Sequence, residues 1–228
     1  MKIAVLGTGT VGRALAAAFN RLGHEVVLGT RDPAETAART TPDAMGGPPY
    51  NEWLAGHDGI RLATFAEAAG DGEVVVNATN GAASLAALAA AGEARLAGKI
   101  LMDVSNPLDF SQGRPPVLNP VNTESLAERI QRAFPEARVV KTLNTMNAGL
   151  MVEPRRLADG EHSVFVSGDD AGAKKMVTGL LAELGHRDVI DLGDITSARG
   201  AEMVLPLWLR LFGALGTPDF NFKVVRRG

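Results

Sequence analysis

A glycine motif directly after an apolar segment constrains the fold of this chain more than any other feature. The apolar residues 3–6 lead into Gly7, Gly9 and Gly12, which have the spacing G-x-G-x-x-G. Residues 13–22 follow with alanine and leucine at helical spacing and contain neither proline nor glycine. In a strand-turn-helix unit, these glycines allow a tight turn, a close approach of a pyrophosphate, and close packing of the helix on the strand. The sequence therefore predicts a dinucleotide-binding turn, with an ordinary glycine-rich connection as the alternative.

The N–H groups at the start of that helix would face the phosphates of the nucleotide, at the positive end of the helix dipole. We expect contacts with the nucleotide along the whole turn, from Gly7, Thr8, Gly9, Thr10, Val11 and Gly12.

The end of the second predicted strand, residues 26–29, bears on the choice of cofactor. Thr30 and Arg31 follow the strand. An acidic residue at this position usually binds the ribose of NAD, whereas a hydroxyl beside a guanidinium suits the additional phosphate of NADP. Asp32 lies one residue later than the usual NAD contact. We therefore predict that Thr30 and Arg31 bind NADP, with a solvent-exposed Arg-Asp turn as the alternative.

Strand and helix patterns alternate along the 228 residues, which is typical of an α/β fold with a doubly wound, mainly parallel Rossmann sheet. The predicted strands are residues 3–6, 26–29, 61–64, 73–77, 99–103, 138–142, 163–167 and 188–192. The predicted helices are residues 13–22, 34–39, 65–69, 84–91, 124–133 and 171–184. A stretch rich in proline and glycine at about 41–60 interrupts this rhythm and predicts a surface insertion. Because the insertion carries Tyr50 and Trp53, we expect it to pack locally, with a ligand lid or subunit contact as alternatives.

We divide the chain into an NADP-binding Rossmann domain over residues 1–193 and a C-terminal helix and extended tail over residues 194–228. Residues 198–215 form an apolar helix that is hydrophobic on more than one side, with Trp208 among its bulky residues. Such a helix must pack against the domain or a second subunit, so we predict a homodimer.

Composition excludes several classes of function. The chain has no cysteine, so disulfides, thiolate nucleophiles and iron–sulfur clusters are excluded. The net charge is −3 and the arginines are scattered among acidic residues, so we expect no nucleic-acid partner. No run reaches the ~18 apolar residues that would span a bilayer. We therefore expect a cytoplasmic protein that binds no metal.

Ligands of open α/β sheets bind beyond the carboxyl ends of the strands, so the residues there are candidate contacts. They are small and neutral after the fourth, fifth and sixth predicted strands. Asparagine and threonine could hydrogen-bond a ribose or carboxamide, and Met146 could contact a flat ring. We predict cofactor contacts from Asn77, Ala78, Thr79, Asn144, Thr145, Met146 and Ala148. Turn residues that bond their own backbone are the alternative.

These strand ends hold no evident proton donor, which reduction of a carbonyl by a nicotinamide would need. Lys141 is the one basic candidate, and we expect it to extend to solvent at the sheet end. All four histidines are expected at solvated positions in loops or at helix ends. A hydride passing between two bound redox cofactors needs aligned rings rather than a catalytic acid, so we predict no catalytic side chain.

Several motifs together resemble the coenzyme F420-dependent NADP oxidoreductases, a family that also resembles the cytosolic reductase domain of six-transmembrane metalloreductases. They are GTGTVG at 7–12, GTRD at 29–32, VKTLN at 140–144, VSGDD at 166–170, and GDITSARG at 193–200 before an apolar helix with Pro206, Leu207 and Trp208. The resemblance spans nearly the whole chain except the insertion. It implies NADP bound at residues 8–11 and at Thr30 and Arg31, with the nicotinamide near Met146 and Ala148 and a deazaflavin stacked on it.

The chain departs from the family pattern at two places. The family often has a lysine one turn beyond the arginine that binds the 2′-phosphate, where this chain has Glu35, and Arg39 could compensate. The second departure is the insertion.

We therefore predict an NADP(H)-dependent oxidoreductase that exchanges a hydride between NADPH and coenzyme F420 or a flavin. One alternative is a reductase of a small imine or carbonyl, in which Lys141 or water donates a proton. The other is a non-catalytic redox sensor that binds NADP(H) and a protein.

Overall fold

The computed structural model describes residues 1–42 and 46–227, so residues 43–45 of the expected insertion and Gly228 of the expected tail lie outside the described residues. Its centre is an eight-stranded sheet with the order β10-β9-β8-β5-β4-β1-β2-β3. The strands are β1 (Lys2–Leu6), β2 (Glu25–Thr30), β3 (Ile60–Thr64), β4 (Val74–Asn77), β5 (Ile100–Asp103), β8 (Arg138–Thr142), β9 (Ser163–Ser167) and β10 (Asp188–Asp191). All eight predicted strands are confirmed, with small differences at their ends.

Neighbouring strands are parallel except β8 and β9, which pair antiparallel. Six strands of this sheet therefore run in one direction, which are β3, β2, β1, β4, β5 and β8. The strands β9 and β10 run in the opposite direction. The prediction of a mainly parallel, doubly wound α/β sheet is confirmed. The central strands β1, β4 and β5 are apolar and buried on both faces, as expected where helices cover both sides of a sheet.

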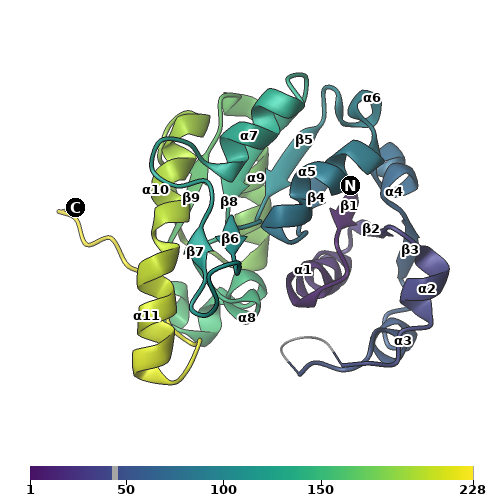
Figure 1. The fold of residues 1–228 in the computed structure, drawn as a ribbon, viewed down its shortest axis with the longest axis horizontal. Coiled ribbons are helices and arrows are strands. Elements are labelled where there is room, and N and C mark those ends of the chain that lie inside the picture. The colour runs from purple at the N-terminus through teal and green to yellow at the C-terminus, as the bar shows by residue number, and fades with distance from the viewer. Residues whose placement is uncertain (43–45, 228) are drawn as a thin grey trace.

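Helices cover each face of the sheet and form two hydrophobic cores. One core includes residues from α1 (Thr10–Arg21), α3 (Tyr50–Ala55), α8 (Ala148–Val152) and α9 (Ala171–Leu184). The other includes residues from α4 (Phe65–Asp71), α5 (Gly81–Ala91), α6 (Glu93–Leu96) and α7 (Leu126–Ala133). The helix α2 (Pro33–Ala37) follows β2, and in Figure 1 it lies with α3 at the opposite end of the molecule from α10 (Ala198–Met203) and α11 (Leu205–Leu215).

Local sequence explains where several helices begin. Ser125 and Glu128 form a capping box at the start of α7, and Thr64 and Glu67 do the same for α4. Asp170 caps α9, whose end is set by Gly185 in the left-handed conformation.

Several features differ from the sequence prediction, among them the short helices α6 and α8, which were not predicted. The predicted helix over residues 198–215 is divided at Val204 into α10 and α11, because Pro206 cannot donate the hydrogen bond that would continue the helix. The insertion contains the short helix α3. The connection after β5 contains a small antiparallel hairpin, β6 (Leu108–Asp109) with β7 (Val117–Leu118).

The short 3-10 helices are η1 (Pro154–Arg156), η2 (Ala158–Gly160) and η3 (Ile195–Ser197). Within residues 1–42 and 46–227, none of the helices combines the length and apolar character that crossing a bilayer requires. The division into residues 1–193 and 194–228 stays a prediction, although the tail returns to the sheet, where Ser163 N donates to Phe222 O at 2.9 Å.

Candidate dinucleotide-binding site

The turn between β1 and α1 has the geometry that its three glycines predict. Gly7 has φ of +114°, and its N–H donates to Gly29 O at 2.9 Å. A Cβ on Gly12 would lie 1.9 Å from Gly7 O, so only glycine allows this packing of α1 on the strand. A Cβ on Gly9 would meet nothing within 4 Å. The turn is therefore closed on the protein side and open at Gly9, the place where a pyrophosphate would approach.

The helix α1 begins at Thr10 directly after Gly9, and no side chain caps its N-terminus. The positive end of the helix dipole therefore favours an anion at this position, where no capping side chain stands. Thr10 and Val11 lie in this first turn, as the prediction requires.

A cavity of about 470 Å³ opens beside the turn. The predicted residues Gly7, Thr8, Gly9, Thr30, Arg31, Ala78 and Thr79 line it. So do residues that sequence reasoning missed, which are Phe65, Asn80 and the alanines 83, 86, 87 and 90 of α5. Small side chains along one helix face leave a smooth apolar surface against which a flat base can lie. The alanine-rich sequence of α5 is the signal that could have indicated it. The size and lining of the cavity fit the adenosine half of a dinucleotide.

Two exposed charged residues follow β2, and they differ in whether a protein group engages them. Thr30 is buried, and its hydroxyl lies 2.9 Å from the Thr36 hydroxyl. The Asp32 carboxylate caps α2 by accepting from Glu35 N at 2.9 Å. Arg31 is exposed and forms no ion pair with any residue in the described part of the chain. The acidic side chain is therefore engaged within its own turn, and the guanidinium is available to a phosphate.

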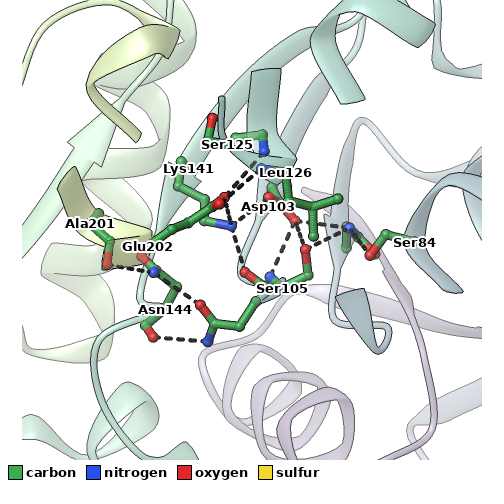
Figure 2. Close-up of polar contacts among 12 residues, drawn as sticks. Ser84, Asp103, Ser105, Ser125, Leu126, Lys141, Asn144, Ala201 and Glu202 are labelled. Atoms are coloured by element: carbon green, nitrogen blue, oxygen red, sulfur yellow. Dashed lines mark hydrogen bonds and ion pairs between the residues drawn. The ribbon is translucent and has the colours of Figure 1, made fainter. Parts of the chain in front are cut away.

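Three charged side chains, from β5, β8 and α10, form a buried triad (Figure 2). The ammonium of Lys141 lies 2.9 Å from Asp103 Oδ2 and 2.9 Å from Glu202 Oε1. It also donates to Ser105 O at 2.5 Å. Burial opposes the charge of Lys141, but the two carboxylates outweigh it and raise the pKa of the ammonium. The expectation that Lys141 extends to solvent is wrong, because its side chain is 0% exposed.

Glu202 links this triad to two helices. Its residue lies in α10, and its carboxylate accepts from Leu126 N at 2.8 Å and from Ala127 N at 3.2 Å, at the start of α7. The dipole of α7 and the charge of Lys141 both favour the anion there. Sequence reasoning missed Asp103 and Glu202; the signal was an acidic residue within an apolar strand or helix pattern.

The side chain of Asn77 is enclosed in a second set of hydrogen bonds, joined to the triad through Asp103. Its amide group donates to Asp103 Oδ1 at 2.8 Å and to Ser84 Oγ at 3.1 Å. Its carbonyl oxygen accepts from Thr79 Oγ1 at 2.6 Å. Asn77 is fully buried, so its side chain positions Thr79 and the end of β5 rather than lining the cavity.

The predicted contacts after β8 lie outside the lining of this cavity. Asn144 is buried and donates to Asn106 Oδ1 and to Ala201 O, each at 3.1 Å. Thr145 is also buried, and Met146 packs in a hydrophobic core. Ala148 begins α8 and is half-buried. The expected contacts of these residues with the nicotinamide stay predictions.

The histidine expectation is wrong for two of the four residues. His162 and His186 are buried, with ring centroids 6.1 Å apart. His186 Nε2 lies 3.0 Å from Met151 O. Burial lowers the pKa of His186 to about 4, and the proximity of His162 adds to this effect. Both rings lie in the packing around η1 and α9, apart from the residues that line the cavity.

Comparison of the sequence with known proteins shows the family of this chain. A family model described as NADP oxidoreductase, coenzyme F420-dependent, matches residues 2–107. The F420-dependent NADP reductase of Methanothermobacter marburgensis is 30% identical over 217 residues, which cover 92% of this chain and 92% of the relative. The chain belongs to the F420-dependent NADP oxidoreductase family. The family resemblance predicted from the sequence is confirmed.

Other relatives extend this family assignment. A crystal structure of a candidate F420-dependent NADP reductase from Arthrobacter sp. FB24 is 66% identical, with a TM-score of 0.95 over 99% of this chain and 100% of that chain. Rat metalloreductase STEAP3 is 32% identical over 91% of this chain, but the chain spans only 38% of that protein's length. The F420-dependent NADP oxidoreductase family is one of NADP-dependent oxidoreductases, and this chain has its Rossmann fold.

Proposed function

We propose that this chain exchanges a hydride between NADPH and coenzyme F420, or a flavin in its place. When NADPH reduces the acceptor, the dihydronicotinamide would supply a hydride to the acceptor ring, and water would supply one proton to the same ring. The task of the protein is then to hold two ring systems face to face and to exclude other acceptors.

The first support is the fit of the site to NADP. The open turn at Gly9 and the uncapped start of α1 suit a pyrophosphate, and the alanine surface of α5 suits the adenine. Arg31 is free to bind an additional phosphate. We propose cofactor contacts from the residues of this cavity and, for the nicotinamide, from the segment containing Met146 and Ala148.

One observation carries the choice of reaction: Lys141, the only lysine at these strand ends within the described residues, is enclosed between two carboxylates. To protonate a substrate it would have to leave both Asp103 and Glu202. The remaining polar groups at the ends of β4, β5 and β8 are amides and hydroxyls, which are poor general acids. This arrangement disfavours reduction of a carbonyl or imine and suits transfer between two redox cofactors.

The deciding experiment mixes the purified protein with NADPH and oxidised F420 and follows the visible absorbance of the deazaflavin. Parallel assays replace NADPH with NADH, or replace F420 with riboflavin, a small cyclic imine or a ketone as the acceptor. We expect rapid reduction of F420 by NADPH and little by NADH. Turnover of the imine or ketone without reduction of either ring cofactor would reject the proposal. Tight NADPH binding without turnover of any acceptor would favour a redox sensor.

We also propose that the protein is a cytoplasmic homodimer that uses α11. Three large apolar residues of this helix are exposed, Leu207 at 54%, Phe212 at 39% and Leu215 at 56%. A surface of this kind is commonly covered by a second subunit. Light scattering on the wild type and on Leu207→Glu tests this assembly, since the charged variant should be monomeric.

A further inference from the structure

Two loops at the carboxyl edge of the sheet are joined by a reciprocal pair of amide side chains. Asn106 follows β5, and Asn144 follows β8. Asn106 Nδ2 donates to Asn144 O at 3.0 Å, and Asn144 Nδ2 donates to Asn106 Oδ1 at 3.1 Å. Each side chain engages the other loop, so a displacement of one loop would break hydrogen bonds to both. We call Asn106 and Asn144 the amide pair.

Two helices fix the amide pair in place. Asn144 Nδ2 also donates to Ala201 O of α10 at 3.1 Å, and Figure 2 shows this contact beside the triad of Lys141. On the side of Asn106, the first residue of α5 is Gly81, where a Cβ would lie 1.9 Å from Asn106 O. The same helix α5 lines the cavity that fits adenosine. The amide pair therefore connects a wall of that cavity to the C-terminal helix α10.

Leu143, directly before Asn144, has a backbone conformation that leucine rarely adopts. Its φ is +59°, in the left-handed region, and the residue is 1% exposed. Such a conformation is unfavourable by itself and persists only where the surrounding structure holds it. The next residue, Asn144, is held by both Asn106 and Ala201. Strained residues of this kind cluster at ligand-binding sites, so the course of this segment is a candidate functional feature.

The amide pair lies where the second half of a bound dinucleotide would extend. The cavity that fits adenosine lies at the end of β2, and a pyrophosphate would approach at Gly9. The remaining nucleotide would then cross the crevice toward the ends of β4, β5 and β8, which lie on the other side of β1 in the sheet. Asn144 lies at this edge but is only 3% exposed. It can therefore act on a ligand mainly through the backbone that it holds.

We propose that Asn106 and Asn144 are positioning residues for the nicotinamide half of NADP(H). They hold residues 143–148 in one conformation, so this segment meets the nicotinamide without first being ordered. The role rests on the NADP binding of the proposed function. A preordered segment raises affinity for the group that it contacts, because binding then does not bear the cost of ordering. It also fixes the ring for hydride transfer, in which a displacement of about 1 Å lowers the rate by about a hundredfold.

Comparison of two ligands isolates the nicotinamide half without any redox partner. Isothermal titration calorimetry measures the dissociation constants of NADPH and of 2′,5′-ADP, which lacks that half, for the wild type, Asn106→Ala, Asn144→Ala and the double variant. We expect each single variant to weaken NADPH about three- to tenfold, the effect of one lost hydrogen bond, and to leave 2′,5′-ADP unchanged. Because the two residues act together, the double variant should bind NADPH no more weakly than the weaker single variant. Asn51→Ala, which removes an exposed asparagine of α3, is the matched control and should change neither constant.

Unchanged NADPH affinity in Asn106→Ala, equal weakening of both ligands, or additive losses in the double variant would overturn the proposal. A merely structural role would lower the midpoint of thermal unfolding without changing the ratio of the two dissociation constants. Asn106 is half-buried, so Asn106→Ala tests the pair even if Asn144→Ala does not fold.

With F420 as the acceptor, kcat should also fall about a hundredfold in Asn106→Ala. If the wild type reduces no F420 while the selective loss of NADPH affinity is observed, only the proposed reaction is rejected. Binding of neither ligand to the wild type would refute the NADP binding on which both proposals rest.

Discussion

Replacing Lys141 with methionine should destabilise the protein by about 3–5 kcal/mol, the usual effect of removing one partner from a buried ion pair. Methionine nearly preserves the shape of the lysine stem, so packing changes little. The loss is electrostatic, because the ammonium is 2.9 Å from oxygens of both Asp103 and Glu202. Ser105 O would also lose its donor, which now lies at 2.5 Å.

The two carboxylates would lose different shares of their polar contacts in Lys141→Met. Glu202 keeps its bonds from Leu126 N and Ala127 N at the start of α7. Asp103 Oδ2 would lose its ion pair, while Asp103 Oδ1 keeps donors from Asn77 and Ser105. Adding Asp103→Asn to Lys141→Met should therefore recover stability, since it removes the buried charge that Lys141→Met leaves without its ion pair.

Urea unfolding followed by tryptophan fluorescence and circular dichroism measures these free energies. In thermal unfolding, for a protein of this size, the same loss corresponds to a midpoint temperature lower by about 6–20 °C. The control is Lys2→Met, which removes an exposed ion pair with Glu25 at 3.6 Å and should cost no more than about 1 kcal/mol. A Lys141→Met variant as stable as this control, or no recovery in the double variant, would refute the reasoning.

Two further predictions concern backbone packing and pH. Gly12→Ala should abolish NADPH binding in a fluorescence titration and lower stability, because its Cβ would lie 1.9 Å from Gly7 O, whereas Gly179→Ala, in open space on α9, should stabilise by about 0.5–1 kcal/mol and leave binding intact. Burial lowers the pKa of His186 in the folded protein to about 4, from its ordinary 6.5. Its contribution to the free energy of unfolding is therefore complete above pH 6.5 and is lost as the pH falls toward 4. Between pH 7.5 and 4.5 the free energy of unfolding should therefore fall less in His186→Gln than in the wild type, and the two losses should differ by about 3 kcal/mol or less. Equal losses in the two proteins would contradict a buried neutral imidazole at His186.

Much of the fold follows from local sequence patterns. The strand over Arg138–Thr142 and the helix over Ala171–Leu184 have the predicted bounds, because an apolar run and a capped, periodic segment are governed by neighbouring residues. The break of the C-terminal helix at Val204 follows from Pro206 in the same local way and could have been predicted. The reversal of β9 against β8 could not, since both directions satisfy the same apolar pattern.

The sequence by itself determined the glycine turn, because the steric demands at Gly7 and Gly12 act over a few residues. It likewise indicated Arg31 as a charge at a strand end. Only the tertiary structure decided which polar groups remain available to a ligand. Asn77 and Lys141 have the same candidate pattern in the sequence as Thr79, yet both are enclosed by partners from other strands and helices. Which buried polar groups pair depends on which elements lie together in space. Because an unpaired polar group is costly in a low-dielectric interior, the groups that lie together hydrogen-bond to each other and are not available to a ligand.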